Sequence, residues 1–309
     1  MKTEIQHVPV HQKRKGLWIG IVSIIMIAVI VCIALSIYVG VSLTKIDRTP
    51  ITETPADYGM IYRDEQFLSA DGETQLKGWI IEPEGEAKAT IIMAHGYHGN
   101  RQEIASGFLP LSQDLTQQGY RIVTFDFRNS GESEGTMTTV GVMEQLDLLG
   151  VIKAVNDETS EPIVLYGISM GGATSLLAAS QSEDVQAVIA DSPFSDLTSY
   201  LQENLPVWTN LPSFPFTPLI LGVVPIIANL NPDDASPIEA VQHLKNIPIF
   251  FIHGDGDKTI PYTESEKMVK VSPTTFKFWV PERSGHVQGY RDYREEYVEK
   301  VTSFIEEAL

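Results

Sequence analysis

The strongest chemical signal in this chain is a serine set between glycines, Gly167-Ile168-Ser169-Met170-Gly171. The motif follows an apolar run typical of a buried strand and precedes a small-residue pattern, 173–179, typical of a helix. A serine on such a strand-to-helix turn holds its hydroxyl exposed, and the glycines leave room for the turn to be tight. The first amides of the helix would face a developing oxyanion. The pattern predicts nucleophilic catalysis by Ser169, although a plain glycine-rich turn has the same letters.

An acid and a histidine follow in the order Ser, Asp, His that triads on this type of turn use. The apolar run 249–252 ends in a turn that holds Asp255 and Asp257, and the run 276–280 is followed by a loop with His286. Ligand and catalytic groups gather at the carboxyl edge of an open parallel sheet. We therefore expect Ser169, one of the two aspartates and His286 on one rim of one sheet.

Three further segments match family patterns. Residues 253–261 match H-G-x-x-D-x-x-V-P with Ile260 in place of valine, Ser284-Gly285-His286 matches a small-Gly-His turn, and 126–135 matches D-x-R-x-x-G-x-S-x-G. On these residues the chain resembles α/β-hydrolase-fold serine hydrolases, in the branch of bacterial esterases and prolyl-oligopeptidase-like proteins, over roughly residues 60–309. The resemblance makes Asp257 the triad acid rather than Asp255, with Asp191 as the weaker rival after another strand.

The roles of the triad follow from its chemistry. Ser169 would attack a carbonyl, His286 would accept and later return the proton, and Asp257 would fix the histidine tautomer. The oxyanion would bind the backbone amide of Met170, and by the resemblance also that of Tyr97. A metal at His95 and His98 is the alternative for that loop, and we reject it because no further ligand lies nearby in the sequence. We expect no metal and no cofactor.

Alternating strands and helices predict how these residues are positioned. The pattern indicates an α/β protein, specifically the α/β-hydrolase fold, with a mostly parallel eight-stranded sheet, helices on both faces and a small helical cap. The first two strands are close in sequence and should form an antiparallel edge. The expected strands span 61–68, 76–82, 90–94, 121–125, 162–166, 187–190, 249–253 and 275–280, and the expected helices include 140–155 and 290–308.

Residues 195–247 interrupt the alternation and are unusually apolar and rich in proline. We interpret this insertion as a cap within a hydrolase domain of residues 61–309. Three interpretations of its apolar residues remain open: packing on the domain core, a lid that offers Trp208, Phe214 and Phe216 to a substrate, or shallow contact with a membrane.

The N-terminus predicts a membrane anchor. Residues 1–15 are polar and end in Lys13-Arg14-Lys15, whereas 16–44 carry no charge and exceed the roughly 20 residues that span a bilayer. A cleaved signal peptide is the alternative, but the apolar run is too long for one and lacks a clear cleavage site. Basic residues before the span predict a cytoplasmic N-terminus, a transmembrane helix at 16–44, a linker at 45–60 and an extracellular catalytic domain.

The outer part of the chain is strongly acidic. The chain has 22 Lys and Arg residues and 40 Asp and Glu residues, of which six basic and two acidic residues lie in 1–48. The remaining residues therefore include 16 basic and 38 acidic ones and have a net charge of −22. Such a surface disfavours nucleic acid as a partner. We therefore expect a membrane-anchored extracellular carboxylesterase that acts on a small-molecule or lipid-like ester. A peptidase or acyltransferase is the alternative, and a non-catalytic binding protein is the third possibility.

Overall fold

The computed structural model describes the backbone of residues 10–309 and the side chains of residues 17–309. Its centre is one eight-stranded sheet with the spatial order β1-β2-β4-β3-β5-β6-β7-β8. The pairs β1–β2 and β2–β4 are antiparallel, and the other pairs are parallel. The mostly parallel sheet and its antiparallel edge, both predicted from the sequence, are confirmed. The strands are β1 (Tyr62–Leu68), β2 (Gln75–Ile81), β3 (Thr90–Ala94), β4 (Arg121–Phe125), β5 (Ile163–Ile168), β6 (Val185–Asp191), β7 (Ile249–Ile252) and β8 (Thr275–Trp279).

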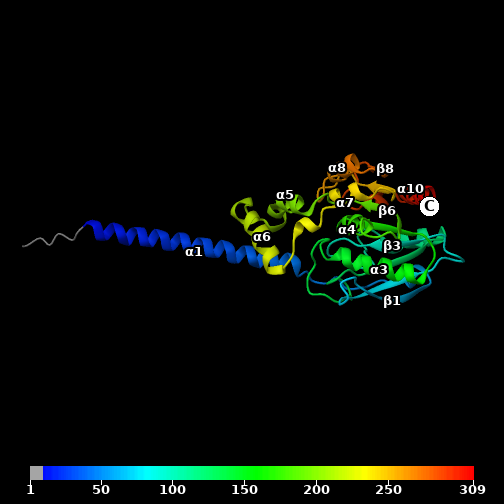
Figure 1. The fold of residues 1–309 in the computed structure, drawn as a ribbon, viewed down its shortest axis with the longest axis horizontal. Helices are drawn as coiled ribbons and strands as arrows, with labels where there is room; N and C mark the ends of the chain where they lie inside the picture. Colours follow the sequence, from blue (N-terminus) through cyan, green and yellow to red (C-terminus); the bar gives the residue numbers. More distant parts are fainter. Residues whose placement is uncertain (1–9) are drawn as a thin grey trace, which may run out of the picture.

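Helices cover both faces of this sheet (Figure 1). Helices α2 (Phe108–Gln117) and α10 (Arg294–Ala308) pack on one face, and α3 (Glu144–Glu158), α4 (Met170–Ala179) and α8 (Thr263–Val271) pack on the other. In β3, Ile91 and Met93 face the first layer, whereas Ile92 and Ala94 face the second. Burial on both faces explains why the central strands are apolar runs instead of alternating ones.

Two helix boundaries differ from the sequence expectation. The helix predicted at 140–155 begins at Glu144, because its side chain turns back to accept the amides of Thr139 and Gly141 and holds those residues in a loop. The C-terminal helix predicted at 290–308 is divided into α9 (Gly289–Asp292) and α10, with a break at Tyr293 where φ is −137° and ψ is 44°.

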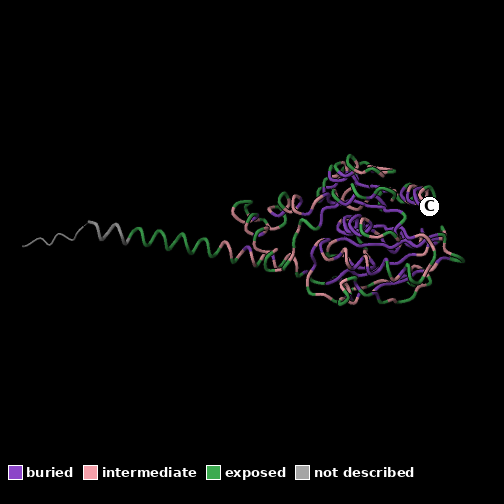
Figure 2. Tube along the Cα trace, viewed as in Figure 1, coloured by how far each residue is buried: buried purple, intermediate pink, exposed green. Residues whose placement is uncertain are grey.

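The N-terminal helix α1 (Val10–Thr44) projects from the domain, and its apolar part Leu17–Thr44 is long enough to cross a membrane. Side chains 17–31 are exposed, and burial begins at Cys32 where α1 meets the body (Figure 2). The insertion after β6 supplies α5 (Leu197–Thr209), α6 (Ser213–Ala228), η2 (Pro232–Asp234) and α7 (Pro237–His243). Helix α6 packs against the C-terminal part of α1. Residues 1–9 of the predicted cytoplasmic segment lie outside the described residues.

The segment that follows α1 is fixed to the domain along its length. The guanidinium of Arg48 donates to the carbonyls of Gly131, Ser133 and Gly135 at 3.4, 2.5 and 3.0 Å. The side-chain amide of Asn100 donates from Nδ2 to the Thr49 carbonyl at 2.9 Å, and η1 (Pro55–Tyr58) then leads into β1. The stretch predicted as a linker therefore holds the end of α1 against the loops at the carboxyl edge of the sheet.

Candidate active site

Ser169 lies on the sharp turn between β5 and α4. Its φ of 51° and ψ of −119° are strained for a residue with a side chain, and such strain is typical of functional turns. Both flanking glycines are required by close packing. A Cβ at Gly167 would lie 2.2 Å from the Gly171 carbonyl oxygen, and one at Gly171 would lie 2.1 Å from that of Ala94. The local structure therefore explains the glycines that made this motif conspicuous in the sequence.

Three loops at the carboxyl edge bring the predicted Ser, His and Asp together. His286 Nε2 lies 2.9 Å from Ser169 Oγ, and His286 Nδ1 lies 2.6 Å from Asp257 Oδ2. Because a carboxylate can only accept, Nδ1 carries the proton and Nε2 is left to accept the hydrogen of the serine hydroxyl. This is the arrangement in which a histidine can act as a general base toward a serine.

The Asp257 carboxylate is held by four donors. Its Oδ1 accepts the amides of Thr259 at 2.8 Å and Ile260 at 2.9 Å, and its Oδ2 lies 2.6 Å from His286 Nδ1 and 3.2 Å from His253 Nε2. Burial alone would raise the pKa of Asp257, but the hydrogen bonds from His253 and His286 hold that pKa well below its ordinary value. Asp257 is therefore ionised at neutral pH.

His253 is a positioning residue that the sequence motif contained but did not explain. It is fully buried, its Nε2 lies 2.8 Å from the Ile260 carbonyl, and its Nδ1 lies 2.8 Å from the Ser265 hydroxyl. The carbonyl requires a proton on Nε2, which then also faces Asp257 Oδ2, so Nδ1 accepts from Ser265. The second histidine thus holds the same carboxylate oxygen of Asp257 that faces His286.

The two rival acids have other partners. Asp255 is exposed and accepts the amide of Arg283. Asp191 is buried at the end of β6 and accepts the hydroxyls of Ser192 and Tyr297, both at 2.8 Å. Neither carboxylate bonds to His286 within the described part of the chain.

The two residues whose amides are predicted to bind the oxyanion, Tyr97 and Met170, both line the same cavity as Ser169. Met170 follows the serine directly, and Tyr97 follows Gly96, whose Cβ position lies 3.5 Å from Ser169 Cβ. His95 shapes this loop: its Nε2 accepts the Phe127 amide at 3.0 Å, so Nδ1 donates to the Gly96 carbonyl at 2.7 Å. Burial lowers the pKa of His95 to about 4, which keeps the ring neutral. The described residues contain no group of three or more potential metal ligands.

Ser169 and His286 open into an apolar cavity of about 450 Å³. Trp208, a predicted cap residue, lines it, but Phe214 and Phe216 do not. The reason is that the later turns of α6 face the serine, through Ile220, Leu221, Val224 and Pro225, whereas Phe214 at its start is 82% exposed. Of the three residues that the lid interpretation offers to the substrate, this structure therefore places Trp208 at the cavity but not Phe214 or Phe216.

The last turns of α1 form another part of the cavity wall, through Gly40, Leu43 and Thr44. The hydroxyl of Tyr97 donates to the Leu43 carbonyl at 2.5 Å, which joins α1 to the loop of the proposed oxyanion amide. A Cβ at Gly40 would lie 2.0 Å from Val224 Cγ2, so α1 and α6 touch closely there. Gly40 inside the apolar run was the available signal, but nothing in the sequence connects that glycine with the site.

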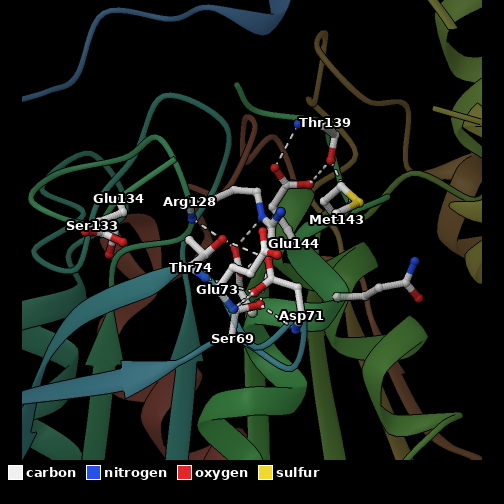
Figure 3. A network of polar contacts seen from close by, with 12 residues as sticks. Ser69, Asp71, Glu73, Thr74, Arg128, Ser133, Glu134, Thr139, Met143 and Glu144 are labelled. Carbon is white, nitrogen blue, oxygen red and sulfur yellow. Dashed lines mark hydrogen bonds and ion pairs between the residues drawn. The ribbon is translucent and has the colours of Figure 1, made fainter. Parts of the chain in front are cut away.

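A network of polar contacts joins the turn after β1 to the loop that precedes α3 (Figure 3). Arg128 donates to both carboxylate oxygens of Asp147, at 3.0 and 2.6 Å, and to Asp71 at 3.0 Å. The Glu144 carboxylate accepts the Thr139 hydroxyl at 2.7 Å, and Thr139 itself lines the cavity. Arg128 and its partners therefore act on the shape of the site, since they do not touch the reacting atoms.

Comparison with known proteins agrees with this architecture. The chain matches the X-Pro dipeptidyl-peptidase (S15) family over residues 71–216. It is 28% identical over 252 residues to the uncharacterized protein YfhR of Escherichia coli K12, covering 79% of this chain and 80% of that protein. It is 25% identical over 244 residues to the lysophosphatidylserine lipase ABHD12 of Macaca fascicularis, covering 75% of this chain and 54% of that one.

A solved structure extends the likeness to nearly the whole domain. The esterase Pf2001 of Pyrococcus furiosus superposes with a TM-score of 0.70 at 25% identity, covering 86% of this chain and 98% of the esterase. The names of these relatives imply two kinds of bond, since a peptidase cleaves amides whereas a lipase and an esterase cleave esters. From its sheet, its serine turn and these relatives, the chain belongs to the hydrolases of the α/β-hydrolase fold.

Proposed function

We propose that the chain is a membrane-anchored serine hydrolase that cleaves carboxylic esters. The observation that carries this proposal is the hydrogen-bonded series Ser169–His286–Asp257, which opens into an apolar cavity. In the proposed reaction His286 Nε2 takes the hydroxyl proton as Ser169 Oγ attacks the ester carbonyl, and Asp257 stabilises the imidazolium. The amides of Tyr97 and Met170 would donate to the oxyanion.

The second half of the proposed cycle uses the same groups. His286 returns its proton to the leaving alcohol, which departs and leaves an acyl group on Ser169. A water molecule then loses a proton to Nε2, attacks the acyl carbonyl and regenerates the serine with release of the acid. The apolar lining favours an acyl group of aliphatic or aromatic character.

The cavity favours esters over peptides that have a free N-terminus. Such peptides carry an ammonium group, which a binding site must meet with a carboxylate when water is excluded. No Asp or Glu lines the cavity within the described part of the chain. The S15 match motivates a peptidase as the second candidate, and an acyltransferase would use the same acyl-serine. Turnover of aminoacyl-nitroanilides without turnover of esters would favour the peptidase.

The anchor and its orientation are part of the proposal. Support comes from the apolar helix Leu17–Thr44 and from the three basic residues that precede it in the sequence. Of the two basic residues just after it, Arg48 is bonded to carbonyls of the domain. These features favour a cytoplasmic N-terminus and an extracellular hydrolase domain.

The test is covalent labelling of the full-length protein in detergent micelles with a fluorophosphonate, together with hydrolysis of p-nitrophenyl acetate. We expect the wild type to label and to turn over the ester, and Ser169→Ala and His286→Ala to lose both. A folded wild-type protein that neither labels nor hydrolyses the ester would refute the enzyme assignment and favour a binding protein.

A further inference from the structure

The contact between α1 and the cap lies close to the end of the proposed span. Counting the roughly 20 residues that cross a hydrocarbon core of about 30 Å from Gly16 places the outer boundary near Leu35. Burial on α1 begins at Cys32, and Ser36 and Gly40, one turn apart, are buried on the face that meets the body. The cap therefore begins at the depth of the outer leaflet, before α1 has left the membrane.

The cap exposes large apolar side chains to solvent. Val207 on α5 is 71% exposed, and on α6 Phe214, Ile226 and Ile227 are 82%, 80% and 53% exposed. We call these four residues the cap tip. In Figure 1 the cap lies beside the C-terminal part of α1, on the side from which α1 projects. A group of large exposed apolar residues marks an interaction surface.

Helix α6 cannot cross the membrane itself. Its 16 residues would extend about 24 Å, which is short of a hydrocarbon core. It contains no charged residue and is apolar on every face, a composition that favours burial in protein or in hydrocarbon over exposure to water. Because α6 packs against α1, the proposed span, α1 carries the cap tip to the bilayer surface, and the bilayer is what would cover the tip.

The cavity lies directly behind the same contact. Leu221, Val224 and Pro225 of α6 and Gly40 and Leu43 of α1 line it, while Ser169 and His286 lie in the same cavity. Helix α6 thus carries both side chains that would be buried in the outer leaflet and side chains that would face an acyl chain.

We propose that the cap tip is inserted in the outer leaflet and that the enzyme takes its ester from the bilayer. The substrate class is a membrane-resident ester with an aliphatic acyl chain, which enters the cavity bounded by α1 and α6. This inference rests on the proposed function, since it assumes both the anchor and the serine chemistry. The strongly acidic domain surface favours uncharged or zwitterionic head groups over anionic ones.

The first test measures the depth of the cap tip, and it needs no activity. The full chain, with Cys32→Ser, carries a spin label at Ile226→Cys or at Ile61→Cys and is reconstituted in phosphatidylcholine vesicles. Ile61 is 76% exposed next to β1 and serves as the matched control. At position 226 we expect the spin label to collide more often with oxygen, which concentrates in the bilayer, than with a water-soluble nickel complex. At position 61 we expect it to collide more often with the nickel complex. Equal nickel access at both positions would overturn the proposal.

The second test compares two esters in the same vesicles. The double variant Val207→Asp/Ile226→Asp should keep p-nitrophenyl acetate turnover within about twofold and lose at least tenfold on 1-palmitoylglycerol, because Asp resists burial in hydrocarbon. Ile61→Asp should change neither rate. An unchanged rate on palmitoylglycerol would overturn the inference, whereas a wild type inactive on both esters would overturn the proposed function. If the double variant loses both activities through misfolding, the spin-label result decides.

Discussion

Replacement of Asp257 by Asn should abolish most activity by reversing one histidine tautomer. In the wild type Oδ1 accepts two backbone amides and Oδ2 faces His286 and His253. In Asp257→Asn the side-chain oxygen stays with the two amides, so the NH₂ group faces both histidines. His286 must then accept at Nδ1 and carry its proton on Nε2, where it cannot receive the hydrogen of Ser169.

The size of this effect follows from comparison with other serine triads. Loss of the correct tautomer at unchanged geometry costs about 10⁴ in kcat, which corresponds to about 5.4 kcal/mol of transition-state stabilisation. KM should change little, because Asp257 lies outside the cavity lining. The assay is p-nitrophenyl acetate turnover, with the concentration of folded protein measured by circular dichroism.

The rival acids provide matched controls. Asp191→Asn removes a buried carboxylate that bonds to Ser192 and Tyr297, so it should lower the melting temperature but leave kcat of the folded fraction within about threefold. Asp255→Asn changes an exposed side chain and should alter neither quantity. The reasoning is refuted if Asp257→Asn keeps more than a tenth of wild-type kcat, or if Asp191→Asn has the larger kinetic effect.

Three further predictions concern stability. Gly40→Val should destabilise the protein by about 1–3 kcal/mol at the α1–α6 contact, because even a Cβ at position 40 would lie 2.0 Å from Val224 Cγ2. Adding Val224→Ala to this variant should restore most of the lost melting temperature. No recovery would contradict the contact. Arg48→Ala removes charged donors to three carbonyls and should lower the free energy of unfolding by about 2 kcal/mol, or the melting temperature by about 4–8 °C. Lys45→Ala, at an exposed position, should have no effect, and equal melting temperatures of the two variants would contradict this prediction. Burial raises the pKa of Glu103 to about 7, so its contribution is complete below about pH 4.5 and is lost as the pH rises through 7. Between pH 5 and pH 8 the free energy of unfolding, measured with urea, should therefore fall less in Glu103→Gln than in the wild type, and the two falls should differ by at most about 3 kcal/mol. An equal fall in both proteins would argue against a buried carboxyl.

The sequence was sufficient for the sheet because local pattern and burial agree there. Strands such as β3 and β7 are apolar throughout, since helices cover both of their faces, and the turn at Ser169 requires glycines on both sides. The order of Ser169, Asp257 and His286 along the chain could be read because each follows a strand whose carboxyl end lies on one edge. These features depend on residues that are close in sequence or on a topology that strand order fixes.

The cap could be located from its sequence but not oriented. Its apolar residues are distributed among the cavity, the contact with α1 and the exposed cap tip, and composition alone does not separate these three environments. This is why Trp208 lines the cavity whereas Phe214 does not. The orientation of a helix that is apolar on every face is decided by its neighbours in space.

The fold, the order of the candidate triad and the apolar N-terminal run could all be predicted from the sequence, because each is encoded in a local pattern. That His253 holds Asp257 and that the last turns of α1 form a wall of the cavity could be seen only in the folded structure. Both depend on contacts between loops and helices that local patterns do not specify. Gly40 and Val224 are separated by 184 positions along the chain, and nothing in either local pattern indicates that the Val224 side chain meets the backbone at Gly40.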